Sequence, residues 1–135
     1  TPPAPGVLIV LVDTDVLIWN LRGDPAAAEE LDSAPGFCLS AVTYMELLQG
    51  LRDTRELRLL RRSLRYWDAR VLHLNEEISA RAMFLVEEYA LSHNMRMADA
   101  LIAAGAQYTG LPLFTANDRH YRHIDGLDLR IFRPS

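Results

Sequence analysis

Val7 to Val12 is an uninterrupted run of valine, leucine and isoleucine that leads directly into Asp13-Thr14-Asp15. A strand with one face in water alternates apolar and polar side chains. A run without alternation therefore predicts a strand buried on both faces in the middle of a parallel sheet. In such sheets the ligand crevice lies beyond the carboxyl ends of the central strands, where the strand order reverses. We therefore expect Asp13 and Asp15 to lie at a binding crevice.

Extended and helical segments alternate along the rest of the chain. Short apolar runs predict further strands at 37–39, 71–74, 113–115 and 129–132. Apolar periodicity and capping residues predict helices at 14–22, 24–31, 41–49, 53–67, 76–92 and 97–108. Thr14 or Asp15 is the expected cap of the first helix. This alternation predicts an α/β fold, a three-layer α/β/α sandwich around a mainly parallel sheet of four to five strands.

The length of 135 residues is that of one domain, which we place at 7–135. Residues 1–6 contain three prolines and are expected to be a disordered or processed lead-in. No apolar run approaches the roughly 20 residues of a membrane span. Cys38 is the only cysteine, so no internal disulfide can form, which fits a cytoplasmic protein.

The formal net charge of −4 argues against binding nucleic acid through bulk electrostatics, so any such contact must be local. All 14 basic residues are arginine. Four of them share one face of the helix predicted at 53–67 and are candidates for contact with RNA or a protein partner: Arg55, Arg58, Arg62 and Arg65. The alternative is a solvated helix face that is partly paired with Asp53 and Glu56.

Acidic side chains follow segments that should be buried: Asp13, Asp15, Glu46, Asp99 and Asp118. Taken singly, Asp99 could interact with the positive end of a helix dipole, and Glu46 could be a solvated helix position. Several carboxylates at one mouth raise each other's pKa values unless a cation lies between them. Mg²⁺ and Mn²⁺ prefer oxygen ligands and serve phosphodiester cleavage by activating water and offsetting charge on the leaving oxygen. Together these acids predict a divalent-metal site.

Four motifs in order resemble those of the PIN-domain family, most closely its VapC-type toxins of bacterial toxin–antitoxin pairs. They are Val12-Asp13-Thr14-Asp15-Val16-Leu17-Ile18, Thr43-Tyr44-Met45-Glu46-Leu47-Leu48-Gln49-Gly50, Ala98-Asp99-Ala100-Leu101-Ile102-Ala103-Ala104 and Leu113-Phe114-Thr115-Ala116-Asn117-Asp118. The similarity extends from Val7 to Phe132. It implies a PIN-like fold and a Mg²⁺- or Mn²⁺-dependent endoribonuclease that cleaves tRNA or rRNA and so inhibits translation.

The resemblance also assigns roles to residues. Asp13, Glu46 and Asp99 match the catalytic metal-binding acids, and Asp118 or Asn117 completes the set. Asp15 takes a supporting role, and Thr115 is expected to hydrogen-bond within the site. A cognate VapB-type antitoxin would hold the enzyme inactive. A homodimer is expected from the resemblance and from the leucine and tryptophan content of the early helices.

Two other functions compete with this interpretation. Asp13-Thr14-Asp15-Val16 after a buried strand also fits the nucleophile motif of haloacid-dehalogenase-type phosphatases. That chemistry normally uses a lysine beside the phosphoryl group, as do response-regulator receivers, and this chain has no lysine. The second alternative is a non-catalytic interaction module in which the acids only cap helices.

Overall fold

The computed structural model describes residues 9–135, and the lead-in 1–6 together with Val7 and Leu8 of the predicted first strand lies outside them. The strands are β1 (Leu11–Val12), β2 (Cys38–Ser40), β3 (Arg70–Leu72), β4 (Leu113–Thr115) and β5 (Leu129–Ile131). The helices are α1 (Thr14–Leu21), α2 (Pro25–Asp32), α3 (Ala41–Gln49), α4 (Thr54–Tyr66), α5 (Glu76–His93) and α6 (Met97–Thr109), with a 3-10 turn, η1, at Asp118–His120. No helix within 9–135 has the length and apolar character needed to cross a membrane.

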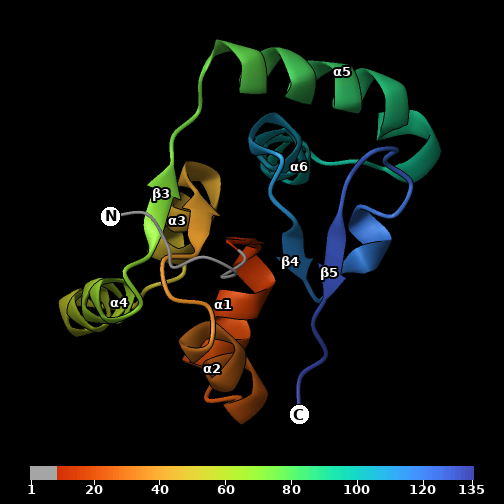
Figure 1. Ribbon diagram of the computed structural model, residues 1–135. Coiled ribbons are helices and arrows are strands. Elements are labelled where there is room, and N and C mark those ends of the chain that lie inside the picture. The colour runs from red at the N-terminus through yellow and green to blue at the C-terminus, as the bar shows by residue number, and fades with distance from the viewer. Residues whose placement is uncertain (1–8) are drawn as a thin grey trace.

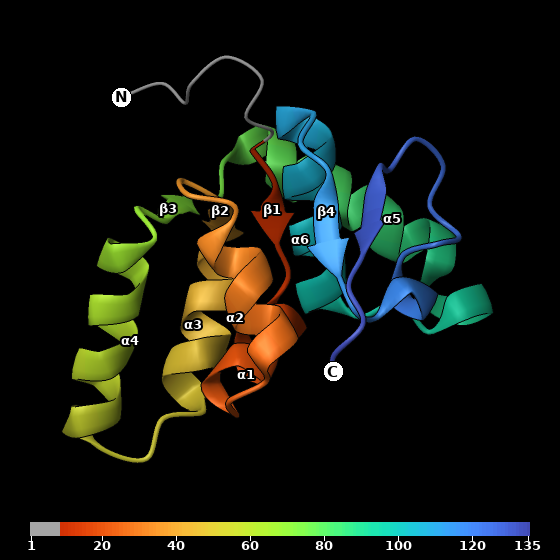
Figure 2. The same ribbon diagram turned by 60° about the horizontal axis from the view of Figure 1, so that its bottom comes forward.

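The five strands form one sheet in the order β3-β2-β1-β4-β5, and every neighbouring pair is parallel. The chain builds the sheet outward from β1 to β3 and then returns to the other side of β1 with β4. In Figure 2, β1 and β4 lie side by side with their arrowheads pointing the same way. The strand order therefore reverses between β1 and β4, where the sequence predicts the crevice. The predicted α/β sandwich with a parallel sheet is confirmed.

The two residues of β1 serve opposite faces of the sheet. Leu11 packs in a core with α5 and α6, whereas Val12 packs in a second core with α1, α2 and α4. Both side chains are fully buried, which confirms the central, doubly covered strand. Figure 1 shows α5 and α6 on one side of the sheet and α1, α2 and α4 on the other. These are the three layers of the predicted sandwich.

Side-chain caps determine where most helices begin. Asp24, Ser40, Asp53 and Asn75 each accept a hydrogen bond from a first-turn N–H. The prediction for α1 is wrong by one residue, because Asp13 rather than Thr14 or Asp15 is its cap. The cap of α1 is thus also the first acid of the predicted site.

Small residues allow α6 to lie close to the sheet. Residues 102–106 of this helix are buried, and Gly105 faces the strands. A Cβ atom at Gly105 would lie 3.1 Å from Leu72 Cδ2 and 3.9 Å from Leu11 Cδ2. This close approach sets the position of α6, and with it the position of Asp99 in the first turn.

Replacing Gly105 with valine should therefore destabilise the fold. A branched side chain has to displace the β1 and β3 leucines, which costs about 1–3 kcal/mol in a well-packed core. Urea unfolding measures the change. The matched control is Ala80→Val at an exposed position of α5, which should lose only about 0.5 kcal/mol of helix propensity. Equal losses in the two variants would contradict the close approach of α6.

Candidate functional site

Asp13 lies at the carboxyl end of β1 with only 4% of its surface exposed. Its backbone N–H donates to the Phe114 carbonyl of β4 at 2.9 Å. Its Oδ1 accepts from the Thr14 N–H at 2.9 Å, and its Oδ2 accepts from the Thr115 hydroxyl at 2.8 Å. The carboxylate is therefore held by the start of α1 and the end of β4, at the point where strand order reverses. Thr115 makes the hydrogen bond within the site that the sequence predicts.

Asp15 lies next to Asp13 on the first turn of α1. Its Oδ1 accepts from the Val16 N–H and its Oδ2 from the Ala116 N–H, both at 2.9 Å. Burial, followed by the adjacent Asp15 carboxylate, raises the pKa of Asp13 to about 7. Burial also raises the pKa of Asp15. The supporting role that the sequence assigns to Asp15 stays a prediction.

Asp99 joins the site from the first turn of α6. Its Oδ1 accepts a hydrogen bond from the Tyr121 hydroxyl at 3.2 Å, and its Oδ2 lies 3.1 Å from His120 Nδ1. Tyr121 is fully buried, and Asp13 is close enough to influence its hydroxyl as well. Burial and then the Asp13 and Asp99 carboxylates raise the pKa of Tyr121 well above its usual value. The phenol is therefore neutral, lies near both acids and donates its single proton to Asp99.

Glu46 is held near this cluster by two threonines. The Thr14 hydroxyl lies 2.8 Å from Glu46 Oε1 and 2.9 Å from the hydroxyl of the buried Thr43. An ionised carboxylate only accepts, so Thr14 donates to Glu46 and Thr43 is left to donate to Thr14. This chain of hydrogen bonds ties the exposed Glu46 to Thr14, which directly follows Asp13 in the sequence.

The fourth motif is arranged differently from the first three. Asp118 Oδ1 accepts from Arg133 Nη2 at 3.1 Å, and Arg133 also donates to the Ala116 carbonyl. This arginine lowers the pKa of Asp118. The Asn117 side chain is exposed, and its backbone N–H donates to Thr115. Neither residue directly contacts the other acids, so the metal-binding role predicted for Asp118 stays a prediction.

The four arginines of α4 do not line this acidic cluster. Arg55, Arg58, Arg62 and Arg65 are exposed on a helix at the β3 side of the sheet, whereas Asp99 comes from α6 (Figure 1). Their predicted partners are engaged elsewhere, because Asp53 caps the helix and Glu56 pairs with Arg52 at 3.0 Å. Contact of these arginines with RNA or a partner stays a prediction.

The acidic cluster has the donors that a hard cation needs. Among residues 9–135, no three acidic, histidine or cysteine side chains converge closely enough to hold an ion by themselves. Mg²⁺ usually takes one or two carboxylates and keeps several waters, and the adjacent Asp13 and Asp15 supply two carboxylates. The raised pKa of Asp13 shows that the negative charge of this pair is costly without a cation. The residues fit Mg²⁺ or Mn²⁺.

Sequence reasoning missed three residues of the site: Thr14, Thr43 and Tyr121. Two of them carry a local signal. Thr14 separates two site aspartates, and Thr43 lies three residues before Glu46 on the same helix face. Tyr121 gives no such signal, because a tyrosine after a turn is usually a core residue. Only the fold brings its hydroxyl between Asp13 and Asp99.

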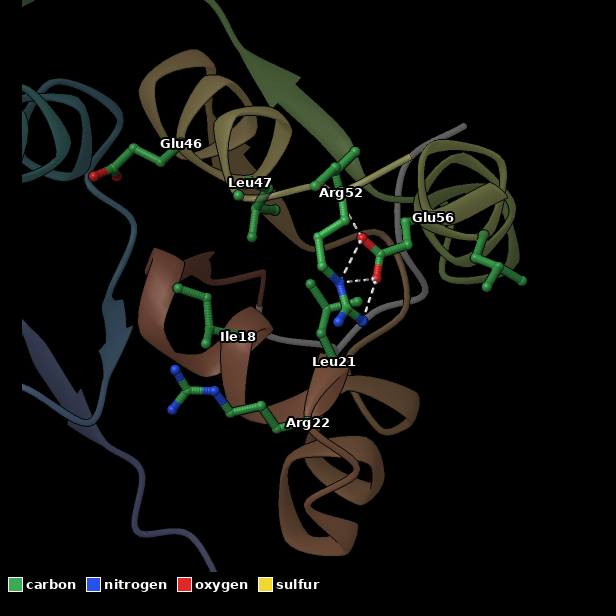
Figure 3. Close-up of a pocket in the computed structure, with 10 residues that line it drawn as sticks. Ile18, Leu21, Arg22, Glu46, Leu47, Arg52 and Glu56 are labelled. Atoms are coloured by element: carbon green, nitrogen blue, oxygen red, sulfur yellow. Dashed lines mark hydrogen bonds and ion pairs between the residues drawn. The ribbon is translucent and has the colours of Figure 1, made fainter. Parts of the chain in front are cut away.

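An apolar groove of about 460 Å³ has Glu46 among its lining residues (Figure 3). We call it the α1–α4 groove. Ile18, Leu21 and Leu59 are among the apolar residues that line it, with Arg22 and the Arg52–Glu56 pair at its rim. Figure 3 shows the Glu46 carboxylate pointing away from that pair. Glu46 therefore belongs both to the groove and to the acidic site.

Comparison with known proteins shows which family the chain belongs to. The sequence model of the PIN domain matches residues 10–127, which contain all four motifs. The chain belongs to the PIN-domain family. Ribonuclease VapC10 of Mycobacterium tuberculosis is 40% identical over 123 residues, which cover 88% of this chain and 90% of that protein. Ribonuclease VapC19 of the same organism is 34% identical over 117 residues, covering 82% and 90%.

Solved structures agree with this PIN-domain assignment. A toxin–antitoxin complex from Klebsiella pneumoniae contains a chain that is 27% identical, with a TM-score of 0.70 over 87% of this chain and 94% of that chain. The parallel sheet and flanking helices are therefore those of a PIN domain, and the acids of this PIN domain occupy the crevice end of its sheet.

The raised pKa of Asp13 predicts how stability depends on pH in EDTA. Its carboxyl titrates near 3.8 in the unfolded chain and near 7 in the folded chain. The folded state therefore holds the extra proton over this interval, and the free energy of unfolding falls as pH rises through it, by on the order of 4 kcal/mol. Asp13→Asn should remove this loss. The asparagine can still accept from the Thr14 N–H and can donate to Thr115.

Urea unfolding in EDTA from pH 4 to pH 8 measures this dependence. The Asp13→Asn variant should be more stable than the wild type at pH 8, and the difference should shrink toward pH 4. Asp125→Asn replaces an exposed carboxylate outside the site and serves as the control. Parallel stability curves for wild type and Asp13→Asn would show that burial does not perturb Asp13.

Proposed function

We propose that this PIN domain is a divalent-metal-dependent endoribonuclease and the toxin of a type II toxin–antitoxin system. The observation that carries the proposal is the buried Asp13 at the switch point of the sheet, with the Asp15 carboxylate beside it and Asp99 held nearby by Tyr121. Relatives at 40% and 34% identity over most of their length are named ribonucleases, which supports RNA as the substrate.

Asp13, Glu46 and Asp99 would hold the cation, with Asp15 beside Asp13 in the same shell. When bound, Mg²⁺ or Mn²⁺ supplies an activated water and offsets charge on the phosphate and the leaving oxygen. Thr115 and Thr14 fix the Asp13 oxygens, and Tyr121 and His120 orient Asp99. Asp118 would complete the shell only after its ion pair with Arg133 breaks and its carboxylate turns to the metal. No covalent nucleophile is needed for this chemistry.

The phosphatase alternative is less well supported. A phosphoaspartate mechanism normally places a lysine beside the phosphoryl group. The chain contains no lysine. Cleavage of cellular tRNA or rRNA, in the cytoplasm, is the activity we propose in its place.

The α1–α4 groove is the proposed docking site of a VapB-type antitoxin. Solved complexes of similar fold are toxin–antitoxin pairs, which supports a protein occupant. The groove exposes Leu21 and Leu59, at 48% and 44% of their surface, and an apolar segment of a partner would cover them. A segment seated there would lie against Glu46. Antitoxin binding and inhibition would thus act through one residue.

A homodimer also stays a prediction, and one of its reasons is weaker than expected. Trp67 is buried, with its indole N–H donating to Asp32, and Trp19 is half-buried against the second core. Light scattering of the purified chain at micromolar concentration tests this prediction, and a monomer would contradict it.

The ribonuclease proposal predicts which acids cleavage requires. Asp13→Ala and Asp99→Asn should each lower the rate of Mg²⁺-dependent RNA cleavage by at least about 100-fold, because each removes a cation ligand, and EDTA should abolish cleavage. Asp118→Asn should have a smaller effect. Mn²⁺ should also raise the melting temperature of the wild type but not that of Asp13→Ala. Asp125→Asn is the matched control. Full metal-dependent cleavage by Asp99→Asn would refute the assignment.

The docking proposal predicts that inhibition and catalysis can be separated. Leu21→Glu and Leu59→Glu place a charge in the groove and should weaken antitoxin binding at least about 30-fold, as loss of an interface hot spot does. The cleavage rate of the free toxin should stay within about twofold. Leu91→Glu on α5 replaces a fully exposed leucine and should change neither property. Calorimetry with the cognate antitoxin measures binding, and wild-type affinity in both groove variants would contradict this docking site.

A further inference from the structure

A second, smaller cavity includes Asp99 in its lining. Its volume is about 120 Å³, and it is lined by the end of α5, the loop before α6 and the η1 turn. The lining residues are His93, Asn94, Met95, Arg96, Asp99, Arg119 and His120. Pockets that enclose a whole drug-sized ligand measure about 300–1,000 Å³, so this cavity fits one group of a larger ligand.

The cavity combines cations that lack acidic partners. Arg96 and Arg119 are exposed, come from different segments, and have no ion pair within residues 9–135. Other arginines of this acidic chain do pair with carboxylates, such as Arg133 with Asp118. Two unpaired guanidinium groups in one small cavity repel each other, and an anion between them would relieve that repulsion.

The remaining features of the cavity also favour an anion. Arg96 is the N-cap of α6 and makes no side-chain capping hydrogen bond, so the positive end of the helix dipole has no side-chain acceptor. The one acid in the lining, Asp99, has both oxygens engaged, by Tyr121 and by His120. These two hydrogen-bonding partners partly offset the charge of Asp99.

We propose that the cavity between Arg96 and Arg119 is a subsite for a backbone phosphate of the RNA substrate, next to the phosphate that is cleaved. This inference rests on the proposed ribonuclease function. An RNA strand whose scissile phosphate lies at Asp13 and Asp99 has to place a neighbouring phosphate close by, and the cavity shares Asp99 with that site. A chain with a net charge of −4 needs such local cations to hold RNA.

The subsite contacts a phosphate that does not react, so it contributes binding rather than transition-state stabilisation. Arg96→Ala and Arg119→Ala should each raise KM for the RNA that the wild type cleaves by about tenfold, with kcat within about twofold. Fluorescence anisotropy of a labelled fragment of that RNA in EDTA should show the same loss of affinity. The slope of log affinity against log salt should fall by about one per arginine.

Three further measurements separate this role from others. Arg81→Ala is the matched control, because Arg81 lies on α5 away from the cavity end of that helix and donates to Gln107 of α6; this variant should bind RNA like the wild type. Arg96→Lys and Arg119→Lys should recover most of the salt slope, because they keep the charge. The Mn²⁺ concentration that half-maximally stabilises the protein against heat should be unchanged in all variants, because the arginines do not hold the ion.

Unchanged KM and anisotropy in both alanine variants would overturn the subsite. A fall in kcat at constant KM, or a shifted Mn²⁺ midpoint, would overturn it too, because the arginines would then act on the reacting centre. Normal RNA binding with escape from antitoxin inhibition would assign the cavity to a peptide carboxylate instead. Absence of metal-dependent RNA cleavage by the wild type itself would refute the proposed function, which distinguishes the two failures.

Discussion

Burial of the Asp13 carboxylate at the end of the central strand is the constraint on which the site depends. An ionised group there is costly, and the surrounding structure offsets that cost only partly. Thr115 and the Thr14 N–H donate to the carboxylate, but Asp15 and Asp99 add like charge, and the pKa of Asp13 stays near 7. The fold thus keeps a destabilising arrangement at the crevice of the sheet, which a divalent cation would relieve.

The topology of the sheet creates this arrangement from distant parts of the chain. β1 and β4 are neighbours only because the chain reverses its order, and this places Thr115 against Asp13. Gly105 lets α6 approach the strands, which carries Asp99 to the same edge. Hydroxyl groups then hold two of the carboxylates: Tyr121 donates to Asp99, and Thr43 and Thr14 form a hydrogen-bonded chain to Glu46.

The sequence was sufficient for the architecture and for the main acids. The unbroken apolar run ending at Asp13 determines a central parallel strand, and cap residues such as Ser40 and Asn75 locate helix starts. Contacts between residues far apart in the sequence could not be predicted from it. Nothing local to Asp118 shows that Arg133 binds it, and helical periodicity groups the α4 arginines without showing that α4 lies at the β3 side. Strand ends also differ, since β3 begins at Arg70 rather than at residue 71.

Two surfaces meet at the acidic site, and Glu46 and Asp99 belong to both the site and a neighbouring hollow. Glu46 lines the apolar groove, whereas Asp99 lines the arginine cavity. The groove has the chemistry of a protein interface, and the cavity has that of a phosphate contact. A toxin needs both, because it has to hold RNA when free and be blocked when bound.

Mapping of RNA ends after brief induction in cells tests the central claim most directly. If Asp13 holds the catalytic cation, wild-type protein should generate new ends at one or a few discrete positions in tRNA or rRNA. The Asp13→Ala variant, expressed to the same level, should generate none of them. The same new ends in both strains, or none in either, would contradict the assignment of this acidic cluster as a ribonuclease centre.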